Sequence, residues 1–277
     1  MPSPRTTLTS RRDQRGFSLI ELLVATLVAG VALTATTTFF AKQMVGMREM
    51  TYRVEAQQAL RASLDTIGRD IRLAGACLSN AGQFIPLAGV NAATDQITIT
   101  TGLVHPDMSC IITTSTVAAN AGQTAIQVAD VTGFSTSTLA YIKAANGGSD
   151  TSRIASIAGN TITLTNALSQ NYLVGTEVDA IDERRYSIDT SLTYPRLMLT
   201  VNRGAPQAFA AGISDLQMQY LLNRNCPTCD IIDLPPDTAT WRLVNEVLVS
   251  ATVTTIGART NVSLTEATRA KPRNLLQ

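Results

Sequence analysis

The sequence predicts an α+β protein in which one long N-terminal helix packs on an antiparallel β headpiece. Two observations carry this prediction. Residues 17–74 contain no proline and run from an uncharged apolar stretch into an amphipathic one, which is typical of a continuous helix. After Gly75 the pattern changes to short alternating segments separated by turn residues, which is typical of strands. The 277 residues give room for such a helix and for a headpiece of ordinary domain size.

The long helix is expected over residues 17–75, with Gly75 as the residue at which the chain leaves the helix. Its first part, about residues 17–41, has the length and composition of a transmembrane segment. Residues 22–41 carry no charge, and about 20 apolar residues are enough to cross the hydrocarbon core of a bilayer. Lys42 is the first charged residue beyond this span.

The second part of the helix is amphipathic, and we expect its apolar stripe to pack against the headpiece. Charged residues spaced four apart lie on the opposite side and support the helix, as in Arg61 and Asp65. The stripe residues follow one another at steps of three, four or seven with one step of six: Met47, Met50, Val54, Leu60, Leu64, Ile67, Ile71 and Ala74.

Residues 76–277 are expected to form the headpiece. Residues 115–180 have a hairpin rhythm of their own and indicate a small inserted β subdomain, in which Gly159 and Asn160 form a hairpin turn. Loops are expected at 79–95, 144–150 and 223–240, and the polar, basic tail 266–277 is expected to be flexible. Alternation predicts strands at 96–100, 125–128, 153–158, 161–165, 176–181, 184–189, 196–201, 215–222 and 243–255.

A basic leader precedes the apolar span. Residues 1–16 contain four arginines and one aspartate, a net charge of +3, and basic flanks stay on the cytoplasmic side of a membrane. Gly16 is followed directly by Phe17 and the span, whereas an ordinary secretory signal has its apolar core before the cleavage site. Glu21 stands at the start of the span. A carboxylate within such a span is costly to insert, by about 2.5–3.5 kcal/mol if it lies at the bilayer centre. Such a residue calls for a cationic partner, and an amine at Phe17 of a neighbouring chain would serve.

This arrangement resembles the class III signal of type IV pilins and of type II secretion pseudopilins. The resemblance implies the pilin fold and cleavage between Gly16 and Phe17 by a prepilin peptidase. It also implies N-methylation of Phe17 and pairing of the Glu21 carboxylate with the terminal amine of an adjacent subunit during assembly.

Four segments of the remaining chain are residues 69–75, 184–188, 209–220 and 247–253. They resemble the corresponding segments of minor pilins of the PilW type. That resemblance implies a subunit that helps to start pilus assembly at or near the tip, and it is shared with J-type pseudopilins. It implies, as partners, other minor pilins, the major pilin, the inner-membrane assembly platform and a tip adhesin. Before assembly the chain would lie in the lipid of the bacterial inner membrane as a single-pass protein with a periplasmic body, and afterwards on the pilus at the cell surface.

Three functions remain open at this point. The first is a minor pilin that primes a type IV pilus, and the second is a J-type pseudopilin of a secretion system. The third is a binding module, in which the headpiece serves as an adhesin or captures DNA. Removal of the leader leaves 18 basic and 20 acidic residues, so charge gives no reason to expect nucleic acid as the main partner.

The four cysteines are Cys77, Cys110, Cys226 and Cys229. In an oxidising compartment they predict disulfides, and of the three connectivities we favour Cys77 with Cys110 and Cys226 with Cys229. Cys226 and Cys229 also fit a redox pair, but their segment is rich in proline and aspartate, unlike a helix N-terminus. A zinc site could draw on Cys77, Cys110 or His105, but the chain has only one CxxC and a single histidine. We therefore expect structural disulfides and no metal.

No catalytic constellation is apparent, and we expect no enzyme activity and no cofactor. The chain has no nucleophile-elbow, P-loop, zinc-protease or dinucleotide fingerprint. His105 is a lone loop histidine, and Asp230, Asp233 and Asp237 do not follow the spacing of a calcium loop. Trp241 is expected in the core or in an interface.

Overall fold

The computed structural model describes residues 17–78, 84–144, 147–191, 194–222, 230–256 and 261–272. Gly16 with the rest of the leader, and Cys226 and Cys229, lie outside these residues. The chain divides into two compact units, Met1–Thr51 and Tyr52–Gln277. This boundary differs from the predicted one after residue 75, because the end of the long helix shares its core with the headpiece.

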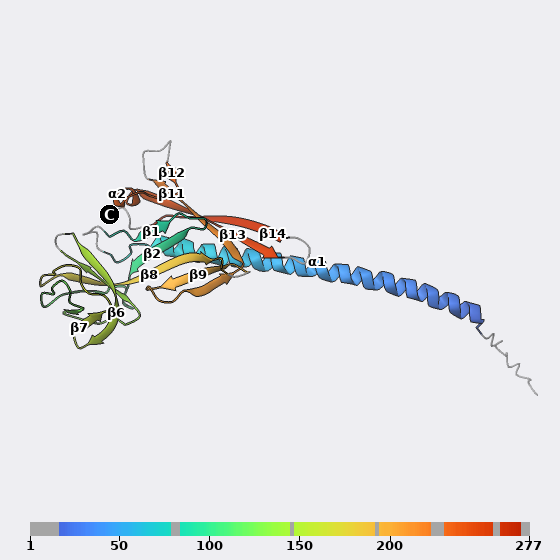
Figure 1. Cartoon of the computed structure of the whole chain (residues 1–277), viewed down its shortest axis with the longest axis horizontal. Helices are drawn as coiled ribbons and strands as arrows, with labels where there is room; N and C mark the ends of the chain where they lie inside the picture. The colour runs from blue at the N-terminus through green and yellow to red at the C-terminus, as the bar shows by residue number, and fades with distance from the viewer. Residues whose placement is uncertain are drawn as a thin grey trace, which may run out of the picture. The chain divides into compact units, whose positions relative to one another are not determined.

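The helix α1 covers Leu19–Leu73, two residues shorter at each end than the expected range (Figure 1). In the first unit its apolar side chains are exposed, and the helix is long and apolar enough to cross a membrane by length and composition. Threonine hydroxyls in this part donate to carbonyls one turn back, as Thr34 Oγ1 does to Gly30 O at 2.7 Å. The hydroxyls are thereby satisfied without water, as an apolar surrounding requires.

The headpiece contains two antiparallel sheets, the larger of which has ten strands in the described residues. Its main path runs in the order β1-β2-β8-β5-β6-β7-β4, while β3 and β9 also pair with β8, and β10 pairs with β9. The strands are β1 (Leu87–Val90), β2 (Gln96–Gly102), β3 (Ile112–Thr114), β4 (Ala125–Gln127), β5 (Leu139–Lys143), β6 (Ser149–Ala158), β7 (Thr161–Leu164), β8 (Glu177–Asp189), β9 (Arg196–Val201) and β10 (Gln207–Ala211).

The smaller sheet has the order β12-β11-β13-β14. The last turns of α1 pack against both sheets in one hydrophobic core, which gives the α+β pilin fold that the sequence predicted (Figure 1). The strands are β11 (Ile213–Leu222), β12 (Ile231–Ile232), β13 (Val244–Ile256) and β14 (Asn261–Ala270), and the short helix α2 (Thr238–Trp241) precedes β13.

The predicted stripe on the helix is buried only in its second half. Leu60, Leu64, Ile67, Ile71 and Ala74 are buried, with Ala56 and Ser63 beside them. The prediction is wrong for the three earlier members, Met47, Met50 and Val54, which are at least half exposed. The step of six residues from Val54 to Leu60 explains the difference, because six residues turn an α-helix about 120° away from the stripe.

The end of α1 is tied to strand β2. Gly75 has the left-handed φ of 76° expected of the residue after a helix, and its N–H donates to Thr100 O at 3.0 Å. Gly102 N–H donates to Ala76 O, and a Cβ on Gly102 would lie 2.3 Å from Cys77 O. The chain after the helix therefore lies directly against β2, and only glycine fits at position 102.

Strand β8 replaces two predicted strands, 176–181 and 184–189. The charged residues Asp182 and Glu183 lie between the two predicted strands, and Asn202 bonds to both from the turn after β9. Its Oδ1 accepts from Glu183 N–H at 2.7 Å, and its Nδ2 donates to Asp182 Oδ1 at 2.9 Å. Figure 1 shows β8 running from the side of the sheet that carries β6 and β7 to the side that carries β9.

A second hydrophobic core lies within residues 111–180, the region in which the sequence indicated a small β subdomain. It is built from β4, β6 and β7, from one face of β5 and from the start of β8. The hairpin turn at Gly159 and Asn160 is present, since Ala158 pairs with Thr161 and Gly159 has a φ of 55°. This core contains no residue of α1.

The expectation of a flexible tail from residue 266 is wrong for residues 266–270. They belong to β14, which pairs with β13 over its full length. Ala270 is buried, and Glu266 forms an ion pair with Arg61 of α1 at 3.3 Å. The polar composition of this segment reflects an edge strand with one solvated face, not an unfolded end.

Several short strands fall outside the predicted ones, and β5 shows the cause. All five of its residues are buried, so its sequence lacks the alternation that marks a half-exposed strand. Strand β1 lies in a segment predicted as a loop and contains Gly89, where a Cβ would approach the Tyr220 hydroxyl to 2.4 Å. The glycine that permits this close contact also weakened the strand signal.

Candidate assembly site

The first turn of α1 carries the residues that the sequence singled out. Phe17 precedes the helix and is 84% exposed, and Glu21 is the acidic residue of the first turn. The turn closes with a bond from Leu22 N–H to Ser18 O at 3.1 Å. Small side chains follow Glu21 at helical spacing, namely Ala25, Ala29 and Ala32.

The Glu21 carboxylate is exposed and takes part in none of the ion pairs of the described residues. The next charged residue along the helix is Lys42, about 32 Å away at 1.5 Å per residue. A carboxylate at this place in an apolar helix is costly unless a cation pairs with it, and none of the described residues supplies that cation. The structure describes this end of the chain from Phe17 on, so it does not bear on Gly16.

The disulfide joins the end of α1 to the headpiece. Cys77 and Cys110 are bonded, with Cα atoms 5.4 Å apart, which is the pairing that the sequence analysis favoured. Cys226 and Cys229 lie outside the described residues. Within the described part of the chain, no cluster of histidine, cysteine, aspartate and glutamate has the arrangement of a metal site.

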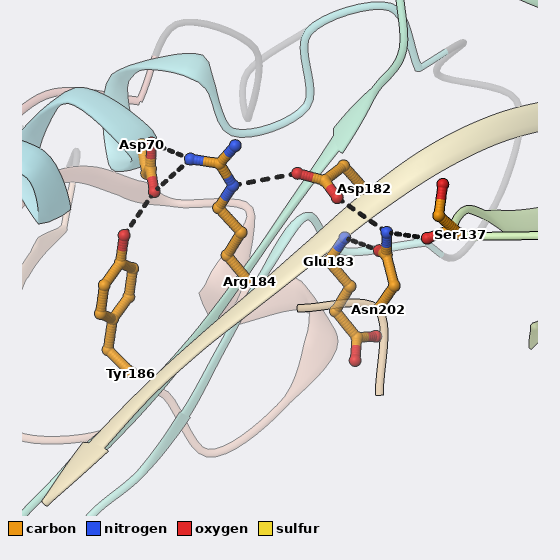
Figure 2. A network of polar contacts seen from close by, with 7 residues as sticks. All are labelled: Asp70, Ser137, Asp182, Glu183, Arg184, Tyr186 and Asn202. Atoms are coloured by element: carbon orange, nitrogen blue, oxygen red, sulfur yellow. Dashed lines mark hydrogen bonds and ion pairs between the residues drawn. The ribbon is translucent and has the colours of Figure 1, made fainter. Parts of the chain in front are cut away.

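A buried carboxylate docks the helix on the larger sheet (Figure 2). Asp70 is 5% exposed and accepts from the Tyr186 hydroxyl at 2.6 Å. Arg184 donates through Nη1 to both oxygens of Asp70 at 3.2 Å and through Nε to Asp182 at 2.9 Å. Burial, and then the hydrogen bond to Asp70, raise the pKa of Tyr186, so that its hydroxyl remains a donor.

The contacts of Asp70 with Arg184 and Tyr186 form a helix dock. This dock brings together two of the segments that carry the family resemblance, residues 69–75 and 184–188. Sequence reasoning named both but did not predict their contact. The helical spacing could have indicated that Asp70 is buried, because it lies three residues after the buried Ile67 and hence on the covered side of the helix. Figure 2 shows the network continuing through Asp182 to Asn202, which donates to Ser137 O at 2.6 Å.

Replacement of Asp70 by alanine is expected to destabilise the headpiece. The Tyr186 hydroxyl would stay buried without its acceptor, which costs about 1–3 kcal/mol. Unfolding can be followed by the fluorescence of Trp241, the single tryptophan, during chemical denaturation. Asp65→Ala on the exposed side of the same helix is the matched control and should change stability by less than about 0.5 kcal/mol. Equal effects of the two changes would contradict the role of the dock.

The remaining polar candidates have structural roles. Asp237 caps α2 by accepting from Thr240 N–H at 2.7 Å, and Gln219 donates to Asp233 at 3.3 Å. Trp241 is in the core as expected, with its ring edge against Tyr220 at a centroid distance of 4.9 Å. His105 lies on the loop before β3 and belongs to no metal cluster of the described residues.

Comparison with known families supports the reading of the N-terminus. Residues 11–37 match the family described as the prokaryotic N-terminal methylation motif. No curated protein matches the chain. The motif supports a type IV pilin-like or pseudopilin subunit, and together with the apolar helix it fits a membrane-anchored single-pass protein.

Proposed function

We propose that this chain is a minor pilin of a type IV pilus, a subunit of the PilW type that primes assembly at or near the tip. The observation that carries the proposal is Glu21, a carboxylate at the start of an apolar helix that pairs with no cation of the described residues. It lies within the methylation motif, five positions into the chain that cleavage after Gly16 would leave. The amine of a processed neighbour would meet it there.

In this proposal a prepilin peptidase cuts between Gly16 and Phe17 and the new N-terminus is methylated. The subunit waits in the inner membrane with its headpiece in the periplasm, and joins the other minor pilins on the assembly platform. The major pilin then follows, and the finished tip is exposed at the cell surface, where it meets a tip adhesin. Because Glu21 needs an amine ahead of it, at least one other minor subunit precedes this one.

The methylation motif supports a J-type pseudopilin of a secretion system equally, and that is the second candidate. Crosslinking and mass spectrometry of sheared filaments separates the two. A minor pilin is crosslinked to pilus subunits in sheared pili, whereas a pseudopilin is absent from them. Binding of host surfaces or DNA by the full-length protein would support a tip-binding role for the headpiece.

Glu21→Ala is expected to block recruitment without blocking processing. Insertion and cleavage do not need the carboxylate, so the chain should reach the membrane and begin at Phe17. Without the carboxylate no neighbouring amine is held, so co-purification with partner minor pilins should be lost and pili should be fewer but of normal form. Co-purification and filament counts are the measurements.

The matched control is Glu49→Ala, which removes the same charge from the same helix beyond the apolar span. This variant should assemble normally. Normal piliation and normal co-purification of Glu21→Ala would refute the pairing role of Glu21, whichever filament system the subunit serves.

A further inference from the structure

A lysine and an aspartate are buried against each other in the headpiece, apart from the assembly site. They lie on β5 and β8, where Tyr141 pairs with Asp179 and Lys143 pairs with Glu177 across the two strands. Lys143 Nζ is 2.9 Å from Asp179 Oδ2, and the two side chains are 6% and 0% exposed. Glu177 contacts the same Nζ atom from the neighbouring position.

The surroundings of this pair are apolar. On the same face of the two strands lie Leu139 and Ile181, and Leu78 and Phe84 from the segment after α1 pack over this group. The Phe84 ring lies 4.5 Å from the Tyr141 ring, and Lys143 Nζ lies 5.8 Å from the centre of the Tyr141 ring. Water therefore has little access to Asp179, while Glu177 keeps a partly exposed side chain.

The ion pair between Asp179 and Lys143 is close, but its geometry is not that of a good hydrogen bond. Neither of its carboxylate oxygens accepts a well-directed hydrogen bond, although Nζ is within contact distance. Burial raises the pKa of Asp179 to about 6, with Lys143 opposing the shift. At Lys143 burial lowers the pKa, but the two carboxylates outweigh it and raise the pKa overall, so the ammonium form prevails.

We propose that Lys143 and Asp179 form an intramolecular isopeptide bond, with Glu177 as the proton carrier. The geometry supplies the three parts that the condensation needs: a buried amine, a carboxyl group in contact with it, and a second carboxylate on the same nitrogen. Contact in a fixed arrangement replaces the high concentration that two free reactants would require.

The reaction begins with transfer of one proton from Nζ to Asp179, which leaves an uncharged amine beside an uncharged acid. The ion pair remains the main form, but the apolar surroundings lower the cost of this neutral pair relative to two charges. Nζ then attacks Asp179 Cγ, so that an N–C bond forms and the C–OH bond breaks. Glu177 takes one of the two protons left on Nζ and delivers it to the departing hydroxyl, which leaves as water, while the last proton stays on the nitrogen of the new amide. Nothing is oxidised or reduced, and no further reactant is needed.

The bond would close a covalent loop around residues 144–178, which include the β6–β7 hairpin of the second core. It would also fix β5 to β8, the strand whose other half docks the helix through Arg184 and Tyr186. The subdomain would then stay attached to the helix dock under tension. This inference concerns the headpiece alone and stands whether or not the proposed pilus function is correct.

Mass spectrometry of the full-length protein, purified from cells and reduced, tests the proposal. Trypsin cuts after Arg153 and Arg184, so the linear peptide 154–184 carries Asp179. In the wild type the linear peptide should be absent. In its place, peptide 154–184 should be found joined to the peptide that contains Lys143, with a mass that is one water lower than the sum of the two peptide masses. Recovery of the wild-type peptide 154–184 in linear form would overturn the proposal.

Three variants make the test specific. Lys143→Arg keeps the positive charge but not the amine, and should release linear peptide 154–184. Glu177→Gln keeps the amine and Asp179 and should slow the condensation about 100-fold, as loss of a proton carrier does. Lys271→Arg, at an exposed lysine, should leave the crosslink complete. An unchanged rate in Glu177→Gln would remove Glu177 from the mechanism, and Trp241 fluorescence checks that each variant is folded.

Discussion

Gly16→Val is expected to leave the arginine-rich leader on every copy of the protein. A peptidase site that accepts glycine has no room for a branched side chain beside the bond to be cut. The nitrogen of Phe17 would then remain in an amide and carry no positive charge. The precursor should stay in the inner membrane and be absent from pili, because its Phe17 could not pair with the carboxylate of a neighbour. Immunoblots and intact masses of membrane and pilus fractions measure both effects.

The control for this change is Gly30→Ala within the apolar span. A Cβ at Gly30 would meet nothing within 4 Å, so this variant should be processed as the wild type is. The wild-type chain should begin at methylated Phe17. Processing of Gly16→Val, or a wild-type start beyond Ala32, would show that the cleavage assignment is wrong.

The helix and the assembly residues could be predicted from the sequence because their signals are local. An uncharged span, a glycine before a phenylalanine and one carboxylate lie within about 30 consecutive residues. Alternation likewise indicated strands in which one face is largely half-buried and the other is buried, as in β2 and β13. The Cys77–Cys110 bond was favoured among only three connectivities.

The contacts that fix the headpiece are long-range, and the sequence does not show them. Asp70 meets Tyr186 across 116 positions of the chain, and Arg61 meets Glu266 across 205. Neither partner looks unusual in its own segment. Strand β5 escaped prediction for a different reason, since complete burial removes the alternation on which the prediction relies.

Loss of the Cys77–Cys110 disulfide is expected to have the largest effect on headpiece stability among the single changes discussed. Cys77→Ser should cost about 2–5 kcal/mol, because the bond restrains the unfolded chain between residues 33 positions apart. It also holds the segment that places Leu78 over Tyr141 in the folded state. Chemical denaturation followed by Trp241 fluorescence measures the loss, and the level of accumulated protein should fall with it.

The partner variants and a reductant decide whether this loss comes from the bond. Cys77→Ser, Cys110→Ser and the double variant should be equally unstable, because each of the three variants loses the same single bond. A double variant whose loss is the sum of the two single losses would contradict the assignment.

Reductant should lower the stability of the wild type by at least as much as Cys77→Ser does. If reductant destabilises Cys77→Ser further, the additional loss measures a second bond, which the predicted pairing places between Cys226 and Cys229. No additional loss, together with two reactive thiols in the native protein, would show that this second pairing is wrong.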